Sequence, residues 1–275
     1  MTLALVLGGG GVAGIAWHTG VLAGLARAGA DPTGADLVVG TSAGATVAAQ
    51  VGGGYGLDEL FARQVDPATL VTERAPPVTV AELLVRLAPI YAADVDAPER
   101  RRRLGAMAID TDTVAEEVRR AILVGRLVDH RWPHRPLLVP VVDAATGERR
   151  VLDRRSGVDL LDAVAASSAV PGVWPPVTFD GTRWIDGGVW TLTNTDLAAG
   201  HDRVLVLAPI VDPALEVELA GLGPGVRAEV VSPDAVSLQA FGADVLDPAV
   251  REPAARAGLA QAADEADRVR ALLAD

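Results

Sequence analysis

The chain has 275 residues, of which 50% are hydrophobic and 22% are charged, and its formal net charge is −12. A chain of this length can bury the core of one large α/β domain or of two small ones. The absence of cysteine excludes disulfides, thiolate metal sites and cysteine nucleophiles. The negative charge argues against a nucleic-acid partner, which would need a positive surface.

The first predicted elements are a buried strand and the helix that follows it. The apolar run Leu3–Leu7 predicts the strand, Gly8–Gly14 a loop, and Ile15–Ala28 a helix that Gly29 closes. No basic segment precedes the strand, and the apolar run is too short for a signal-peptide core or a membrane span. We therefore expect a cytoplasmic protein.

A second strand and helix follow directly. Leu37–Val39 predicts a buried strand, and Ala45–Val51 predicts an alanine-rich helix. The order strand, helix, strand, helix implies a parallel sheet with right-handed crossovers.

The segment from residue 55 to residue 136 has a different character. Its prolines separate short helical pieces, of which Val80–Leu87 and Thr113–Leu123 are the clearest. We interpret this segment as a helical cap or insertion within one domain that spans residues 1–275. The segment interrupts the α/β alternation directly after the second helix. Its far end is therefore expected to fold back over the turn between the second strand and that helix.

Regular structure resumes after the insertion. The predicted elements are the hairpin strands Leu137–Val142 and Arg149–Leu152, a helix over Val158–Ser167, an extended proline-rich stretch up to Gly188, a short helix capped by Asn194, a buried strand over Arg203–Ala208, and alanine-rich helix beyond Pro248.

The first motif that carries chemistry is Gly40-Thr41-Ser42-Ala43-Gly44, between the second strand and its helix. A serine there sits on a sharp turn with its hydroxyl exposed above a helix N-terminus. The glycines suit a turn that has no room for side chains. The backbone N–H of Ala43 and the helix dipole can stabilise negative charge as it develops.

The second motif is the glycine loop Gly9-Gly10-Gly11-Val12-Ala13-Gly14, which also follows a strand and opens a helix. Successive N–H groups there form an anion site, which would suit a pyrophosphate or an oxyanion. A dinucleotide site needs an acidic residue at the far end of the next strand, but Asp36 lies at its start. An oxyanion hole beside Ser42 explains both loops at once.

The third motif, Asp186-Gly187-Gly188, leaves a carboxylate accessible and lets the backbone approach another group closely. A serine nucleophile needs a base, and His201 would formally complete a Ser, Asp, His order. It follows a short helix, however, where a surface position is expected. His18 lies one turn past the glycine loop and is expected to be a packed or half-exposed histidine.

Together, the three motifs resemble those of the patatin-like phospholipases, whose pattern is a glycine-rich loop, a G-x-S-x-G elbow and a later D-G-G. The small residues and prolines of Ala165–Gly172 and Pro175-Pro176 also look like the family's stretch before its aspartate. The likeness covers roughly residues 3–54 and 137–208.

The resemblance implies a three-layer α/β/α sandwich with a mostly parallel sheet and a Ser42–Asp186 dyad that hydrolyses lipid carboxylic esters. Gly14, Gly40, Gly44, Gly187 and Gly188 would be the motif glycines. The implied oxyanion hole consists of the N–H groups of Gly9, Gly10, Gly11 and Ala43. No metal or organic cofactor is implied.

One position departs from the family pattern, because Ala13 stands where the family usually has Lys or Arg. The oxyanion N–H groups remain, but a nearby cation is removed.

The insertion offers two further predictions about a lipid substrate. Five apolar residues either line an acyl channel or pack the cap onto the core. They are Leu83, Leu84, Leu87, Ile90 and Tyr91. The basic run Arg100–Arg103 is expected to face water or lipid headgroups, which allows a transient contact with a membrane surface.

Two alternative functions stay open at the level of sequence. An acyltransferase of the malonyl-transferase type shares a similar core but carries a histidine before its nucleophile, where this chain has Thr41. A lipid- or nucleotide-binding protein without turnover is the other alternative, and Ala13 makes it plausible.

Overall fold

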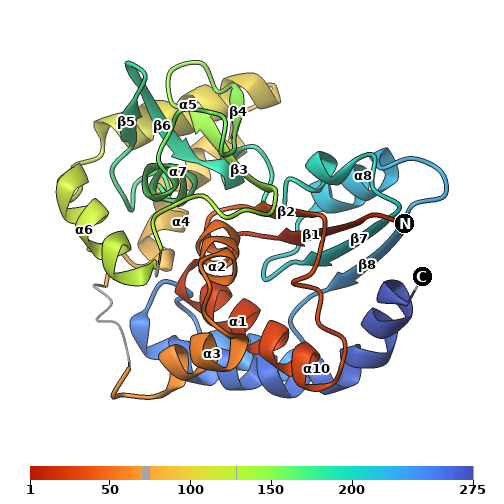
Figure 1. Cartoon of the computed structure of the whole chain (residues 1–275). Helices are drawn as coiled ribbons and strands as arrows, with labels where there is room; N and C mark the ends of the chain where they lie inside the picture. The colour runs from red at the N-terminus through yellow and green to blue at the C-terminus, as the bar shows by residue number, and fades with distance from the viewer. Residues whose placement is uncertain (70–74, 128, 275) are drawn as a thin grey trace.

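A mixed β-sheet with helices on both faces forms the centre of the molecule (Figure 1). The structure is a computed structural model, which describes residues 1–69, 75–127 and 129–274. Within them the strand order is β5-β6-β3-β2-β1-β7-β8, with β4 paired to β3. The strands are β1 (Leu3–Leu7), β2 (Leu37–Gly40), β3 (Leu137–Asp143), β4 (Arg149–Leu152), β5 (Val177–Phe179), β6 (Thr182–Asp186), β7 (Arg203–Leu207) and β8 (Arg227–Val231).

The α-helices of the described residues alternate with these strands and fill the long segment after β2. They are α1 (Gly11–Arg27), α2 (Ala43–Gly52), α3 (Leu57–Val65), α4 (Val80–Ala92), α5 (Ala97–Asp110), α6 (Glu116–Arg126), α7 (Leu160–Ser167), α8 (Pro213–Gly221), α9 (Ala235–Phe241) and α10 (Arg251–Leu273). A short 3₁₀ helix, η2 (Thr195–Ala198), precedes β7.

The sheet is parallel from β3 through β8 and antiparallel at its other edge. β1 pairs in parallel with β2 and β7, while β6 pairs antiparallel with both β3 and β5. The parallel strands read as continuous apolar runs because both of their faces are covered. Alternate residues of β1 confirm the three layers: Leu5 packs in the core with α1, α2, α7 and α10, whereas Val6 packs toward α8.

The contact between α1 and α10 depends on glycine. A Cβ atom on Gly20 would lie 2.1 Å from the carbonyl oxygen of Ala255, and one on Gly24 would lie 2.5 Å from the Cβ of Ala262. The two helices therefore approach more closely than any side chain would allow. The packing accounts for glycines inside a helix, where they otherwise reduce stability.

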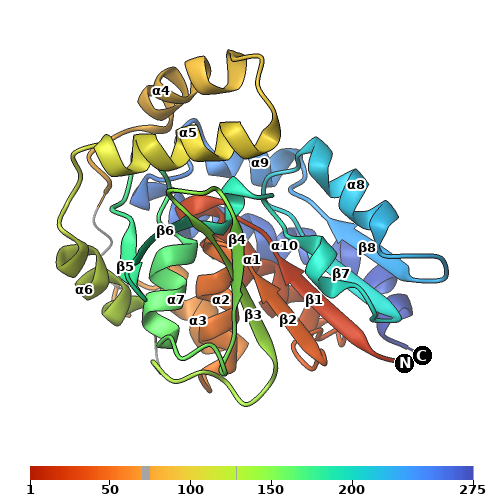
Figure 2. The ribbon, with the colours of Figure 1, turned by 90° about the horizontal axis from the view of Figure 1, so that it is seen from above.

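The segment from residue 55 to residue 136 divides between two places. Its first helix, α3, packs against α1 and α10. The helices α5 and α6 instead lie near the edge of the sheet formed by β5 and β6, and α4 lies outside α5 (Figure 2). Thr79 begins α4 with a capping box. Its Oγ1 accepts a hydrogen bond from the Glu82 N–H, and the Glu82 carboxylate accepts one from the Thr79 N–H.

The basic run on α5 is less uniform than we predicted. Arg102 and Arg103 are exposed and pair with Glu99. Arg101 instead donates to the carbonyl of Gly147 (2.8 Å), and its guanidinium lies 4.0 Å from the centre of the Trp190 ring. That side chain therefore attaches α5 to the core.

Several boundaries differ from the sequence-based expectation. The first helix begins at Gly11 rather than Ile15, so the glycine loop contributes to its first turn. The extended stretch before Asp186 is a hairpin of β5 and β6. Among the described residues, no helix has both the length and the hydropathy needed to cross a bilayer.

Candidate active site

Ser42 occupies the sharp turn between β2 and α2, as the G-x-S-x-G pattern predicts. Its backbone is left-handed in φ (+54°), which is unusual for a residue other than glycine. A Cβ on Gly44 would lie 1.9 Å from the carbonyl oxygen of Leu7, so only glycine permits this approach of α2 to β1. The Ser42 N–H donates to the Oγ of Ser167 (3.1 Å), which further fixes the turn.

Asp186 ends β6, and its carboxylate accepts a hydrogen bond from the side chain of Ser42. Its Oδ1 also accepts from the N–H of Gly188 at 2.7 Å. The residue is only 5% exposed. Burial raises the pKa of Asp186 to about 7, although the bonds from Ser42 and Gly188 and the charge of Arg119 act in the opposite direction.

The glycines around Asp186 are required by close approaches. A Cβ on Gly187 would lie 2.3 Å from the carbonyl oxygen of Pro140 on the neighbouring strand, and one on Gly188 would lie 2.9 Å from Oδ1 of Asp186. Gly187 therefore admits no side chain without a shift of the backbone, and a side chain on Gly188 would displace the Asp186 carboxylate.

The glycine loop lies beside Ser42, but one of its N–H groups is occupied. A Cβ on Gly9 would lie 3.6 Å from the Cβ of Ser42. The N–H of Gly9, however, donates to the carbonyl of Leu192 (2.8 Å), so the prediction that it belongs to an oxyanion hole is wrong. Gly10, Gly11 and Ala43 stand at the N-termini of α1 and α2, and within the described residues their N–H groups have no hydrogen-bond acceptor.

A pocket adjoins the Ser42 hydroxyl, and the insertion forms part of its wall. The lining residues come from the glycine loop with the start of α1, the elbow with the start of α2, the segment before α4, α6, the segment before β5, and the segment between α9 and α10. They are Gly11, Val12, Ile15, Ser42, Ala43, Thr46, Pro76, Arg119, Arg126, Ser168, Val170, Trp174 and Leu246. The far end of the insertion, α6, therefore lines the same pocket as Ser42.

The residues that we considered for an acyl channel do not line this pocket. Leu83 is buried in an apolar cluster with Trp174 and Leu246, which themselves line the pocket. Leu84 and Tyr91 are 59% and 58% exposed. Packing and solvent exposure, rather than a channel, account for this face of α4.

Arg119 is the residue of the site that sequence reasoning missed. It is 3% exposed, its guanidinium lies 4.0 Å from the centre of the Trp174 ring, and its Nη2 donates to the Oγ of Ser168 (3.3 Å). Its positive charge lowers the pKa of Asp186. The sequence carries one signal: Arg119, Leu123 and Arg126 recur at i, i+4 and i+7 on the buried face of α6.

The rings of His18 and His201 each hydrogen-bond to a backbone carbonyl. His18 is fully buried, its Nε2–H donates to the carbonyl of Gly8 (2.9 Å), and burial lowers its pKa to about 4, so the ring is neutral. His201 is half-buried, and its Nδ1 bonds the carbonyl of Ala198 (3.1 Å). Neither of these two rings hydrogen-bonds to Ser42, whereas the carboxylate of Asp186 does.

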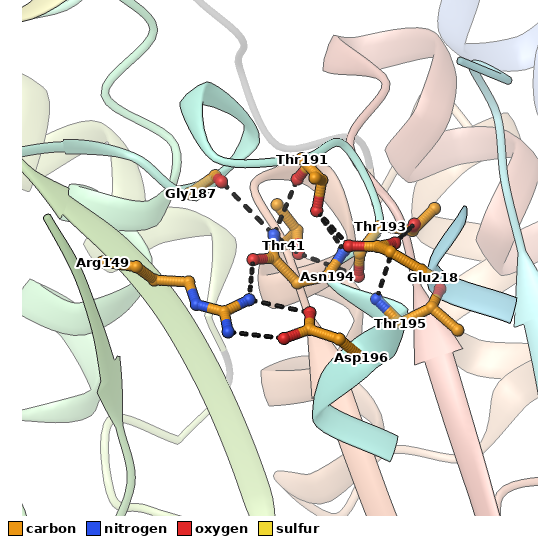
Figure 3. A network of polar contacts seen from close by, with 9 residues as sticks. All are labelled: Thr41, Arg149, Gly187, Thr191, Thr193, Asn194, Thr195, Asp196 and Glu218. Carbon is orange, nitrogen blue, oxygen red and sulfur yellow. Dashed lines mark hydrogen bonds and ion pairs between the residues drawn. The ribbon is translucent and has the colours of Figure 1, made fainter. Parts of the chain in front are cut away.

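A second polar network connects the elbow of Ser42 and the turn of Asp186 (Figure 3). The Nδ2 group of Asn194 donates to the Oγ1 of Thr41 (3.2 Å) and to the carbonyls of Gly187 (3.3 Å) and Thr191 (2.7 Å). Its Oδ1 accepts from Arg149 (2.9 Å). Within the described ranges, no group of three or more His, Asp or Glu side chains could hold a metal ion.

Two solved structures are similar to this chain. The crystal structure of VipD from Legionella pneumophila is similar over 97% of this chain and 66% of that one, at 12% identity and a TM-score of 0.48. The crystal structure of the type III effector protein ExoU is similar over 98% and 53%, at 14% identity and a TM-score of 0.44. This chain thus spans just under two thirds of the first and about half of the second.

No curated protein matches the sequence significantly. The sequence profile of the patatin-like phospholipases matches residues 5–199, which contain the glycine loop, the elbow and Asp186. The chain therefore belongs to the patatin-like phospholipase family.

Proposed function

We propose that this protein hydrolyses carboxylic esters of lipids, with Ser42 as the nucleophile and Asp186 as its base. The observation that carries the proposal is the hydrogen bond from the Ser42 side chain to a buried carboxylate whose pKa is about 7. A base poised near neutral pH both ionises and accepts a proton effectively there. An ordinary aspartate, with a pKa of about 3.9, would be a weak base.

In the first half-reaction, Asp186 takes the proton of Ser42 as the Oγ attacks the ester carbonyl carbon. The N–H groups of Gly10, Gly11 and Ala43, at two helix N-termini, would hold the oxyanion that forms. The tetrahedral intermediate then collapses, the C–O bond to the alcohol breaks, and the proton on Asp186 passes to the departing alkoxide.

In the second half-reaction, a water molecule attacks the acyl–Ser42 ester. Asp186 accepts the proton of that water and, when the second tetrahedral intermediate collapses, returns it to the Oγ of Ser42. The acyl group leaves as a carboxylic acid. No step requires a metal or an organic cofactor.

Family membership supports a lipid as the substrate, with phospholipids and lysophospholipids as the first candidates. The pocket supports the same class, because Ile15, Val170 and Leu246 offer apolar walls next to the nucleophile. Arg119 supplies a cation near the site in a chain that has Ala13 in the glycine loop. A cytoplasmic location stays a prediction from the sequence.

Labelling with a fluorophosphonate tests the nucleophile. We expect mass spectrometry to find the adduct on Ser42 and the label to be lost in Ser42→Ala. Ser156→Ala, which changes a serine in the turn after β4, should react at the wild-type rate. An adduct on Ser167 or Ser168, or an active enzyme that carries no adduct, would contradict the assignment.

A further inference from the structure

The loop that follows the aspartate turn touches every motif of the proposed site. Leu192 accepts the N–H of Gly9 from the glycine loop (2.8 Å). The hydroxyl of Thr41, directly before the nucleophile, donates to the carbonyl of Thr193 (3.4 Å). Asn194 reaches both Thr41 and Gly187, the residues next to Ser42 and Asp186.

The surroundings of Asn194 constrain both its backbone and its side chain. It is fully buried, and its backbone is left-handed (φ +52°), a conformation that asparagine tolerates better than most residues. Arg149 donates to its Oδ1 and pairs with Asp196 at 2.8 and 2.5 Å. Because a guanidinium only donates, this contact fixes which end of the carboxamide is oxygen and directs the NH₂ group toward Thr41 and Gly187.

Glu218 on α8 holds the backbone of the same loop (Figure 3). Its carboxylate accepts from the hydroxyls of Thr191 (2.5 Å) and Thr193 (2.8 Å) and from the N–H of Thr195 (3.0 Å). Asn194 is therefore braced from two sides, by Arg149 across the sheet and by Glu218 from a helix.

We propose that Asn194 is a positioning residue, whose carboxamide holds the elbow of Ser42 and the turn of Asp186 at a fixed separation. Strands β2 and β6 are not neighbours in the sheet, since β3 lies between them. The carboxamide is a direct side-chain link between the ends of those two strands. This inference rests on the proposed function, because it assigns Asn194 a role in the same Ser42–Asp186 pair.

The test uses substitutions that remove the link without straining the backbone. Asn194→Gly deletes the carboxamide but adopts positive φ freely. Thr41→Val removes the hydroxyl acceptor from the same link, whereas Thr41→Ser keeps it. Asp180→Gly is the matched control, because Asp180 also has positive φ (+53°) but lies in the turn between β5 and β6.

Activity on p-nitrophenyl acetate is measured against pH, with the folded fraction followed by circular dichroism. In Asn194→Gly we expect kcat to fall at least ~10-fold with KM nearly unchanged, since small misplacements of reacting groups are costly. The hydrogen bond from Ser42 lowers the pKa of Asp186. Loosening this bond should therefore raise that pKa and move the acid limb of the rate profile to higher pH. Thr41→Val should show the same two changes, and Thr41→Ser and Asp180→Gly neither.

The possible outcomes separate this inference from the proposed function. Wild-type kcat and an unmoved acid limb in folded Asn194→Gly, or in Thr41→Val if Asn194→Gly does not fold, would overturn the positioning role alone. A loss of kcat that only follows the unfolded fraction would overturn it as well. A wild-type protein that shows no turnover dependent on Ser42 would contradict the proposed function and, with it, this role.

Discussion

Burial of a single carboxyl group brings the pKa of Asp186 into the range that suits the base we propose. The residue ends a strand in the core, and the loss of hydration raises its pKa to about 7 against the opposing effects of Ser42, Gly188 and Arg119. Sequence motifs identified Ser42 and Asp186 as separate residues, and the resemblance to the family joined them. The helical spacing of Arg119, Leu123 and Arg126 indicates a buried face of α6. It does not predict that the guanidinium of Arg119 lies near Asp186, because that depends on how the insertion folds back.

Removing the charge of Arg119 should shift the pH dependence of hydrolysis. Because this charge lowers the pKa of Asp186, Arg119→Gln should raise that pKa above about 7 and move the acid limb of kcat/KM to higher pH. The difference from wild type should shrink at alkaline pH, where Asp186 is ionised in both proteins.

The control for this change lies next to it on the same helix. Arg120 is exposed and pairs with Asp162, so Arg120→Gln should leave the acid limb of kcat/KM at the pH of the wild type. A limb that stays in place in Arg119→Gln would mean that the guanidinium does not act on the base.

Asp186 should also reduce stability above neutral pH. Its folded-state pKa is raised from 3.8 to about 7, so the protonated form favours folding below pH 3.8, and this contribution is lost as the pH rises through about 7. Asp186→Asn, which is never charged, should therefore have a higher Tm than wild type at pH 8, with little difference at pH 3.5. Thermal unfolding at both pH values measures this. A variant that is less stable than wild type at pH 8 would contradict the buried-charge explanation.

At the scale of elements, the apolar runs of β1, β2 and β7 were predictable because buried parallel strands are continuous apolar segments. The hairpin β5–β6 was not, because three prolines obscure its start and its first strand is only three residues long. The predicted start of α1 lies too late in the chain, because glycine normally disfavours helix formation. Here Gly10 and Gly11 open the helix because its first N–H groups need no intrahelical acceptor.

The glycine contact between α1 and α10 predicts a sharp difference between two similar substitutions. In Gly20→Ala the new Cβ would meet the carbonyl of Ala255 at 2.1 Å, so the helices must separate, at a cost of ~1–3 kcal/mol. Gly221→Ala at the end of α8 meets no atom within 4 Å and should be neutral or stabilising. Urea unfolding of both variants measures the difference. Equal stability would show that the helices do not pack this closely.

At the scale of the whole molecule, the proposed site is assembled from segments far apart in the chain. The glycine loop follows β1, the elbow follows β2, Asp186 ends β6, and α6 comes from the insertion. The three-layer sandwich brings the first three together at one end of the sheet, with β6 antiparallel to β3. From the sequence, only the resemblance to the family placed them in one site. The loop from Thr191 to Asn194 then connects them through hydrogen bonds that no sequence pattern predicts, because they depend on the positions of side chains.

The central claim is that a serine and an aspartate, without a histidine, carry out hydrolysis. The most direct measurement is kcat/KM on p-nitrophenyl butyrate for wild type, Ser42→Ala, Asp186→Asn and His201→Ala, each confirmed as folded. The account predicts losses of ~10²–10⁴-fold in Asp186→Asn, the range for loss of a general base, and at least as large a loss in Ser42→Ala. His201→Ala should stay close to wild type. An inactive His201→Ala together with an active Asp186→Asn would contradict the account and assign the base to histidine.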